Sequence, residues 1–405
     1  MSIRSCNIAV IGGGVLGCAI ARRLGQAGME DVLVLEKEHD VARHASGRNS
    51  GVVHSGFHLK PGSLKAQLCV AGSRRIADYC RERDIPFQQV GKLIVAVNDN
   101  EAQRLPELQR RAEANGLRGS RLVSGDDLRG IESAAQGVAG FFSPHDGIID
   151  ARRFVKSLAH DARDHGVRFA FDHELIAASE RDTCVDLRTS NGSCQARWVI
   201  NCSGLHADRI AHLFDVGRQY AIIPFRGEYF ALPPEQRHLV HGLVYPTADP
   251  RFPFLGVHFT RTVHGDVLIG PNAVLAWHRE AYGNRDIRLA RSLATLANAN
   301  FIRMATRPGF IRMACRELTT SWSKQAFVRE ARKLIPAIEG SGIRKHQAGI
   351  RAQLVDRQGR LVMDFTTCST TRSVHVLNAV SPGFSSSLAF ADHIVDQCLQ
   401  TGYFH

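Results

Sequence analysis

The sequence lacks the features that mark membrane-spanning and disulfide-built proteins. Its 405 residues contain no run of about 18 apolar residues, the length that a helix needs to cross a bilayer. Its ten cysteines form no Cys-x-x-Cys pair and follow no regular spacing, so we expect thiols in a reducing compartment and no metal site. The first apolar strand pattern begins at Asn7 and leaves no room for a secretion leader. The sequence therefore favours a cytoplasmic protein.

The chain also has fewer acidic than basic residues. It carries 39 Asp and Glu residues against 51 Lys and Arg residues, which gives a formal net charge of +12 at pH 7. Such an excess suits nucleic acid, an anionic membrane surface or an anionic substrate. Because the basic residues form no long block, we favour a solvated basic surface and expect no nucleic-acid partner. Peripheral contact with the inner face of the cell membrane stays compatible with this charge.

The chain begins with the pattern of a strand, a helix and a second strand. Residues 7–11 read as a buried strand, and residues 15–27 carry an apolar stripe with helical spacing that ends at Gly28. Residues 31–35 form a second buried strand, which is followed by Glu36. This order predicts one βαβ unit of a parallel sheet.

The turn inside this unit carries a dinucleotide-binding fingerprint. Gly12-Gly-Gly14-Val-Leu-Gly17 has the G-x-G-x-x-G form, in which the three glycines serve a tight turn, a close approach to pyrophosphate and helix–strand packing. The helix start at Val15 and Leu16 supplies N–H donors to the phosphates. Glu36, with Lys37 beside it, is placed to accept hydrogen bonds from ribose hydroxyls. The fingerprint predicts a bound dinucleotide but does not separate FAD from NAD.

The segment that follows Glu36 favours FAD. It is rich in glycine and small polar residues, and such a loop can wrap a long ligand with backbone and hydroxyl donors. A simple surface loop is the alternative. The residues expected to contact the cofactor here are Arg43, Ser46, Arg48, Asn49, Ser50 and Gly51.

Beyond residue 221 the pattern of the chain changes. Short strands separated by turn residues are predicted at 222–232, 239–245, 254–260 and 266–270, and they indicate a large, mainly antiparallel sheet. Elsewhere we expect helices over 62–82, 100–116, 152–165 and 287–335 and from residue 388, a strand over 91–97, and a hairpin with its turn at Asn191-Gly192.

Several segments resemble flavoproteins of the D-amino-acid-oxidase type. The fingerprint, residues 49–56 and residues 199–208 carry this likeness. More narrowly, the chain is similar to the L-2-hydroxyglutarate dehydrogenases. The segments that carry the narrower likeness are residues 54–66, 91–95, 224–228, 245–246, 249–260, 270–276 and 348–353. It is weakest over about 285–335, and Gly383-Phe384 stands where the family has small residues.

The resemblance implies FAD as cofactor and oxidation of L-2-hydroxyglutarate to 2-oxoglutarate, with electrons passed to a quinone or to oxygen. It also implies an α/β fold in which a Rossmann-like FAD-binding domain is interleaved with a mainly antiparallel substrate domain. We expect the FAD-binding domain to comprise residues 1–80, 145–215 and 340–405, and the substrate domain residues 81–144 and 216–339.

Oxidation of a 2-hydroxy acid requires a base and an anchor for the carboxylate. His54 is the expected base because imidazole titrates near neutral pH, and its segment is similar to that of glycerol-3-phosphate oxidising flavoproteins, whose histidine has this role. His58 and His258 are alternatives. Arg351 is the expected anchor, since a guanidinium binds carboxylate through two parallel hydrogen bonds. Additional substrate contacts are expected from Arg226, Lys60, Arg251 and Tyr245.

Two further segments are expected at the cofactor. The N–H groups and helix dipole of Ser385, Ser386 and Ser387 suit the flavin edge where negative charge builds on reduction, although a plain helix cap explains them too. Near the ADP half we expect Cys202, Ser203, Gly204 and Leu175.

Other functions remain open at this point. An amino-acid or imino-acid oxidase and a glycerol-3-phosphate oxidase suit the same motifs. A flavoprotein that acts on RNA and a non-catalytic FAD module are alternatives from other classes.

Overall fold

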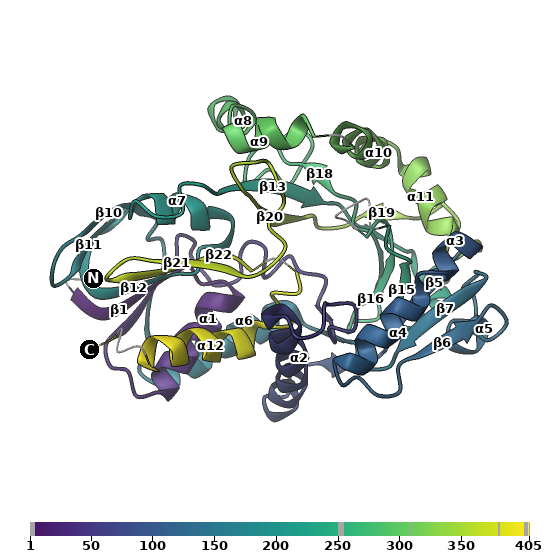
Figure 1. Cartoon of the computed structure of the whole chain (residues 1–405), viewed down its shortest axis with the longest axis horizontal. Coiled ribbons are helices and arrows are strands. Elements are labelled where there is room, and N and C mark those ends of the chain that lie inside the picture. The colour runs from purple at the N-terminus through teal and green to yellow at the C-terminus, as the bar shows by residue number, and fades with distance from the viewer. Residues whose placement is uncertain (1–4, 250–254, 308, 380, 401–403, 405) are drawn as a thin grey trace.

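The computed structural model describes residues 5–249, 255–307, 309–379, 381–400 and 404. The chain forms a mixed α/β structure in which two eight-stranded sheets lie toward opposite ends of the molecule (Figure 1). Two three-stranded sheets complete the framework. This arrangement confirms the expected fold class.

The first sheet contains the predicted βαβ unit. Its central strand, β1 (Ser5–Ile11), pairs in parallel with β2 (Val32–Leu35) and β12 (Gly192–Asn201). Outside these, β9 (Arg168–Ala170) pairs in parallel with β2, and β22 (Ser373–Asn378) pairs in parallel with β12. Antiparallel strands complete the sheet: β10 (Leu175–Glu180), β11 (Val185–Thr189) and β21 (Thr366–Ser369).

Both faces of this sheet are buried, as the continuous apolar runs of its strands require. Ile8 and Val10 belong to one core, together with residues of α1 (Val15–Gln26), α6 (Ala151–Asp164) and α12 (Ser387–Gln400), which lie below the sheet in Figure 1. Ala9 and Ile11 belong to a second core with side chains of β10 and β11. Alternate residues of one strand therefore fill two different cores.

The second sheet confirms the large, mainly antiparallel sheet predicted after residue 221. Of its neighbouring strand pairs only β15–β5 is parallel. Its order is β19 (Arg344–Lys345), β14 (Phe230–Ala231), β17 (Val267–Ile269), β16 (Phe259–Arg261), β15 (Leu243–Pro246), β5 (Lys92–Ala96), β7 (Ala139–Ser143) and β6 (Arg121–Ser124).

The small sheets carry segments that reach the site. One has the order β18 (Val274–Leu275), β13 (Ala221–Gly227), β20 (Gly349–Val355), and the other β3 (Val52–Val53), β8 (Gly147–Ile149), β4 (Phe87–Gln88). Both draw on distant parts of the chain, which agrees with interleaved domains. The predicted domain boundaries themselves stay a prediction.

The remaining helices largely follow the sequence pattern. The predicted helix over 287–335 is divided into four helices. The one over 100–116 is divided into two, because Pro106 lacks an N–H and is accommodated in the first turn of a new helix. The helices are α2 (Leu64–Glu82), α3 (Asp99–Ala102), α4 (Leu105–Ala114), α5 (Leu128–Ile131), α7 (Ala207–His212), α8 (Leu289–Leu296), α9 (Ala299–Ala305), α10 (Phe310–Trp322) and α11 (Lys324–Arg332), with 3₁₀ turns at Gly204–His206 and Pro234–Leu239.

The predicted hairpin forms, but its turn is shifted by one residue. Thr189 pairs with Gly192, so Ser190 and Asn191 make the two-residue loop. Gly192, with φ of +127°, opens β12 in a conformation that other residues rarely adopt. Among the described residues, no helix combines the length and apolar character that crossing a bilayer demands.

Candidate cofactor and substrate site

One cavity of about 740 Å³ joins most of the predicted site residues. It starts at the carboxyl ends of β1, β2 and β12, where Ile11, Leu35 and Cys202 line it, and it extends to β15 and β20. Ligands of open α/β sheets bind at this edge of the sheet. The cavity falls in the size range of small-molecule and cofactor sites, about 300 to 1,000 Å³.

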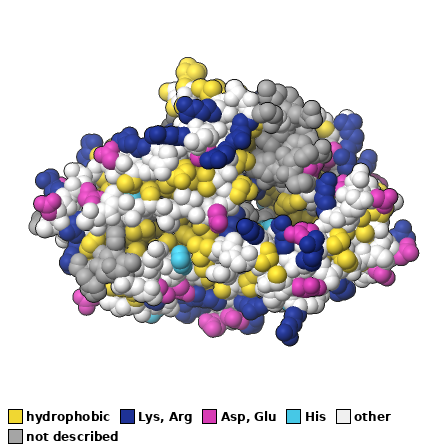
Figure 2. Space-filling view, in the orientation of Figure 1, with side chains coloured by type: hydrophobic (Ala, Val, Ile, Leu, Met, Phe, Trp, Pro, Cys, Tyr) yellow, Lys and Arg dark blue, Asp and Glu magenta, His cyan; other side chains and the backbone are white. Residues whose placement is uncertain are grey.

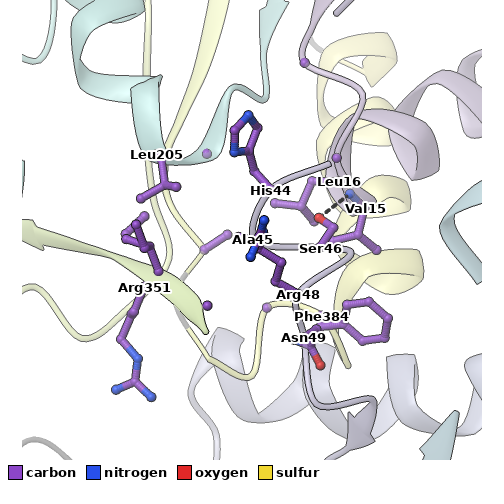
Figure 3. A pocket seen from close by; sticks show the side chains of 18 of the residues that line it. Val15, Leu16, His44, Ala45, Ser46, Arg48, Asn49, Leu205, Arg351 and Phe384 are labelled. Carbon is purple, nitrogen blue, oxygen red and sulfur yellow. Dashed lines mark hydrogen bonds between the residues drawn. The ribbon is translucent and has the colours of Figure 1, made fainter. Parts of the chain in front are cut away.

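The fingerprint glycines have the close contacts that the sequence predicts. A Cβ atom on Gly17 would lie 1.8 Å from the carbonyl oxygen of Gly12, and one on Gly12 would lie 2.9 Å from the carbonyl oxygen of Cys202. Gly12 also has a φ of +107°. The amide of Val15, at the start of α1, donates to Ser46 Oγ at 2.9 Å (dashed in Figure 3). The turn is therefore a backbone cradle that side chains would fill, as phosphate binding requires.

The loop after Glu36 contacts other parts of the protein and lines the same end of the cavity as the glycine turn. Glu36 lines the cavity and accepts from the amides of Gly13 at 2.5 Å and Glu38 at 2.9 Å. The guanidinium of Arg48 stacks on the ring of Tyr282, with 3.7 Å between its central carbon and the ring centroid. These contacts, together with the place of the loop in the cavity wall, oppose the alternative of a simple surface loop.

Most of the predicted residues line the cavity. At the nucleotide end and along the loop these are Gly12, Gly14, Val15, Leu16, Glu36, Lys37, Arg43, Ser46, Arg48, Asn49, Ser50, Leu175, Cys202, Ser203 and Gly204. At the other end they are His54, Tyr245, His258, Arg351 and Ser385. Gly17, Gly51, Ser386 and Ser387 do not line the cavity. The backbone requires glycine at position 51, because its φ is +78° and an added Cβ would lie 2.2 Å from the carbonyl oxygen of Ile149.

Arg226 and Arg351 were both predicted to contact the substrate, but the pairing of β13 with β20 places them on opposite faces. Arg351 lies opposite Phe225, and Ile350 lies opposite Arg226. Side chains of directly opposed residues share a face and neighbours in a strand alternate, so Arg226 points away from Arg351. Arg226 is buried, donates to the carbonyl of Gly283 at 2.9 Å and pairs with Glu228 at 3.3 Å. It supports the cavity wall from outside and does not line the cavity.

Two further substrate contacts, Lys60 and Arg251, were predicted. Lys60 is exposed in the loop before α2 and does not line the cavity. Arg251 lies outside the described residues.

His54 is held by a buried polar cluster. Its Nδ1 lies 2.7 Å from Nζ of Lys92, and that ammonium also donates to Oδ1 of Asp146 at 2.6 Å. Asp146 is fully buried and accepts further hydrogen bonds from Ser55 Oγ and Ser143 Oγ, each at 2.8 Å. Burial, followed by the charge of Lys92, lowers the pKa of His54 well below 6.5. The imidazole is therefore neutral near neutral pH.

His258 and Arg351 lie close to this cluster. The ring of His258 stacks on Tyr245 with 3.8 Å between centroids, and its Nδ1 lies 2.9 Å from the carbonyl oxygen of Gly256. Burial lowers the pKa of His258 to about 3. Arg351 projects from β20 away from the fingerprint turn (Figure 3), and its charge contributes to the lowered pKa values of both histidines. The cavity thus ends in neutral imidazoles beside a guanidinium.

Comparison with known families agrees with this geometry. Residues 7–397 match the family described as DAO, FAD dependent oxidoreductase. The chain belongs to this family. Its cofactor is accordingly FAD, and the glycine cradle, the cavity volume and the donors of the loop fit a long dinucleotide.

Relatives of this FAD-dependent oxidoreductase match it over nearly its whole length. L-2-hydroxyglutarate dehydrogenase of Indibacter alkaliphilus is 38% identical, covering 97% of this chain and 99% of that protein. The Escherichia coli K12 enzyme of the same name is 37% identical, covering 96% and 92%. The human mitochondrial enzyme is 37% identical, covering 98% and 90%.

Solved structures of other oxidoreductases share the fold. L-alpha-glycerophosphate oxidase from Mycoplasma pneumoniae, solved with FAD bound, has a TM-score of 0.79 at 23% identity and covers 97% of this chain and 94% of its own. Glycine oxidase from Geobacillus kaustophilus has a TM-score of 0.73 at 18% identity, with the same coverage. These likenesses place the chain's architecture among flavoenzymes.

Sequence reasoning missed the buried side of this oxidoreductase's site. Lys92 is 2% exposed and Asp146 is fully buried, and neither was predicted at the site. A lysine that opens the apolar strand Lys92–Ala96 was the available signal, since a buried ammonium requires a partner. Tyr229 also lines the cavity and was not predicted.

The unusual Gly383-Phe384 pair fits the site. A Cβ on Gly383 would lie 1.9 Å from the carbonyl oxygen of Ala379, so the turn before α12 requires glycine. The ring of Phe384 packs on Phe154 in the core, with 5.5 Å between centroids. The aromatic side chain is thus anchored in the core although the residue contributes to the cavity wall.

Proposed function

We propose that this protein oxidises L-2-hydroxyglutarate to 2-oxoglutarate. The observation that carries the proposal is its likeness, over 96–98% of the chain, to enzymes named for that substrate. The cavity adds chemical support, because it presents a guanidinium and neutral imidazoles to one bound molecule. A 2-hydroxy acid offers the matching carboxylate and hydroxyl groups.

The nucleotide half of FAD would lie along the glycine turn and the loop from Arg43 to Ser50. Amides at the start of α1 would bind its phosphates, and Glu36 would face the ribose. Bound FAD supplies the hydride acceptor. Ser385 lines the cavity near His54 and accepts from the His54 amide at 2.8 Å, which fixes the turn before α12 against the base.

Arg351 would bind the substrate carboxylate next to the reacting carbon. It lines the cavity from β20, and a guanidinium holds a carboxylate in one orientation through two hydrogen bonds. A hydroxyl group bound in this way is presented to the same end of the cavity as His54. Arg351 therefore acts as an anchor and orienting residue in this proposal.

His54 would accept the hydroxyl proton. Its neutral imidazole is in the correct charge state for a base, and its backbone is fixed by Ser385. His258 is also neutral, but its Nδ1 is directed at the carbonyl of Gly256 and its ring at Tyr245. These contacts favour a wall role for His258, and His58 does not line the cavity.

A substrate panel tests the proposal. The oxidised holoenzyme is mixed without oxygen with L-2-hydroxyglutarate, glycerol 3-phosphate, glycine or L-proline, and the loss of flavin colour is followed. We expect L-2-hydroxyglutarate to bleach the flavin at lower concentration and faster than the others. Faster bleaching by glycerol 3-phosphate or by an amino acid would reassign the substrate to the corresponding alternative.

We also propose that the electrons pass to a quinone in an anionic membrane and that α8 to α10 face this membrane. Hydrophobic side chains gather at the top of Figure 2, where Figure 1 places α8 and α9. Leu289 is 73% exposed and Trp322 75%. The exposed arginines of the same segment include Arg288, Arg303 and Arg307. Apolar side chains beside cations are the composition of interfacial helices.

A further inference from the structure

The contact between Lys92 and His54 constrains which imidazole nitrogen carries the proton. Nζ of Lys92 lies 2.7 Å from Nδ1, while Lys92 itself does not line the cavity. An ammonium has only donors, so it requires a lone pair on Nδ1 and leaves the imidazole proton on Nε2. In that tautomer the nitrogen left for the cavity donates a hydrogen bond. It has no lone pair with which to accept a proton.

His54 becomes a base at Nε2 only when Lys92 is an uncharged amine. The amine lone pair then accepts the Nδ1 proton, and the Nε2 lone pair is free. Asp146 is equipped for this state, because Ser55 Oγ, the Ser55 amide and Ser143 Oγ donate to it independently of Lys92. With Lys92 charged, burial raises the pKa of Asp146, but the charge and hydrogen bond of Lys92, followed by the serine hydroxyl donors, outweigh it and lower that pKa.

We propose that Lys92 is the residue on which the substrate's hydroxyl proton comes to rest and that His54 passes it on. This inference rests on the proposed function of the site. As the substrate O–H bond breaks, its proton bonds to Nε2 and the Nδ1 proton moves to Nζ of Lys92. Bound FAD would supply the acceptor for the hydride of the substrate C–H bond. His54 stays neutral, and one proton has moved from substrate to Lys92.

The surroundings favour a proton that ends on Lys92. Lys92 is 2% exposed and Asp146 is fully buried, so the ion pair that forms lies in a medium of low polarity. The rings of Tyr245 and Phe57 also face the ammonium, at 4.8 Å and 5.5 Å from their centroids. These attractions grow as the proton moves, and interactions of this kind accelerate a reaction.

The protonation state of the whole cluster decides the pH dependence. The groups that act on His54 are Lys92, Asp146, His58, His258 and Arg351. Burial lowers the pKa of His58 to about 4 and that of His258 to about 3, so both are neutral near neutral pH. The reactive state holds one proton fewer than the state with ammonium and imidazole. The rate therefore rises with pH, because raising the pH removes that proton from the cluster.

The Lys92→Arg variant distinguishes whether Lys92 acts as a proton acceptor or only as a fixed cation. Lys92→Arg keeps a charge beside Nδ1 but cannot lose its proton. We expect anaerobic flavin reduction to slow by roughly 100- to 10,000-fold, as for loss of a positioned acid–base group. Lys65→Arg is the matched control, because Lys65 is another buried lysine whose ammonium donates to the carbonyl of Met363. A Lys92→Arg rate within a few-fold of wild type, with the pH profile retained, would overturn the proposal.

The tautomer of His54 gives a test that needs neither the Lys92→Arg variant nor the substrate. The protein is labelled with ¹⁵N-histidine, and the His54 signals are those absent from His54→Asn. In oxidised wild-type holoenzyme we expect Nε2–H at low pH and Nδ1–H as pH rises through the kinetic step. A single tautomer throughout contradicts the proposal. Failure of L-2-hydroxyglutarate to bleach the flavin contradicts the proposed function alone, since the tautomer is read without substrate.

Discussion

At the scale of single residues, the account assigns binding and chemistry to different side chains. His54→Asn keeps polarity and approximate size but removes the base. FAD content and substrate affinity should stay near normal while the rate of flavin reduction falls by roughly 100- to 10,000-fold. Stopped-flow reduction measures the rate, and the flavin spectrum reports whether the cofactor site is intact. An altered spectrum with only a modest loss of rate would make His54 a residue that orients the flavin.

The lowered pKa of His54 fixes the sign of its own pH effect. Because burial and the charge of Lys92 place that pKa well below 6.5, the imidazole is already neutral at neutral pH. A histidine acting without Lys92 would lose activity only as the pH falls through this lowered pKa. A rate that rises with pH above neutral would therefore have to come from a group other than His54 alone. Flavin reduction followed from acid to alkaline pH distinguishes the two profiles.

Arg351→Lys should weaken substrate binding without loss of FAD. A lysine supplies a charge at the same place but not the two-pronged donor pair. The expected loss is about 2 kcal/mol of substrate interaction, or roughly a thirtyfold rise in the Michaelis constant. Steady-state kinetics with purified holoenzyme measures it. A colourless purified variant would assign Arg351 to the cofactor site or to the fold.

Residues carried by a motif lie together at one cavity, whereas residues brought there by the fold were not predicted. The fingerprint and the histidine and arginine motifs placed Gly12, His54 and Arg351 at one cavity. Lys92 and Asp146 are 54 residues apart and meet only because β5, β7 and β8 bring them together. Arg226 was predicted to contact the substrate, but the strand register places its side chain on the opposite face from Arg351. Local sequence does not determine which residues pair across strands.

At the scale of elements, the glycine turn and α1 form one rigid unit. Gly17→Ala places a Cβ 1.8 Å from the carbonyl oxygen of Gly12, so the helix must move away from the strand. We expect loss of bound FAD and a lower melting temperature. Gly130→Ala is the control, because no atom lies within 4 Å of the added Cβ in the short helix α5. A yellow Gly17→Ala protein with normal FAD content would contradict this role for the turn.

The segment from α8 to α10 carries the membrane proposal. Replacing Leu289 and Leu293, 73% and 56% exposed, by glutamate places charge on the apolar surface and removes attraction to anionic lipid. We expect reduced binding to vesicles that contain anionic phospholipid, with flavin reduction by substrate unchanged. Leu122→Glu is the control, since Leu122 is 44% exposed on β6. Vesicle binding that ignores salt and lipid charge would contradict the proposal.

Element boundaries followed sequence rules closely when local chemistry set them. The helix predicted over 152–165 forms as α6, and the side chain of Asp150 caps its start by accepting from the Arg153 amide. The hairpin turn lies one residue earlier than predicted, because Gly192 has a positive φ and is the first residue of β12. The long helical region became four helices, since apolar spacing predicts helical structure more reliably than where each helix stops.

At the scale of the whole molecule, the fold class followed from the change of pattern near residue 221. Buried apolar runs predicted the parallel sheet, and short separated strands predicted the antiparallel one. The order of strands within the second sheet could not be predicted, because β5, β6 and β7 join it from an earlier part of the chain. That insertion is what places Lys92 against His54.

The proposed reaction requires one hand of the substrate. Oxidised holoenzyme is mixed without oxygen with the L or the D isomer of 2-hydroxyglutarate, and both flavin bleaching and 2-oxoglutarate are measured. Arg351 and His54 lie at fixed places in one cavity wall, so only one hand can present its hydrogen to the flavin while its carboxylate and hydroxyl are both bound. The account predicts that the L isomer bleaches the flavin and yields one 2-oxoglutarate for each flavin reduced. Equal or faster bleaching by the D isomer, or bleaching by the L isomer without 2-oxoglutarate, would contradict it.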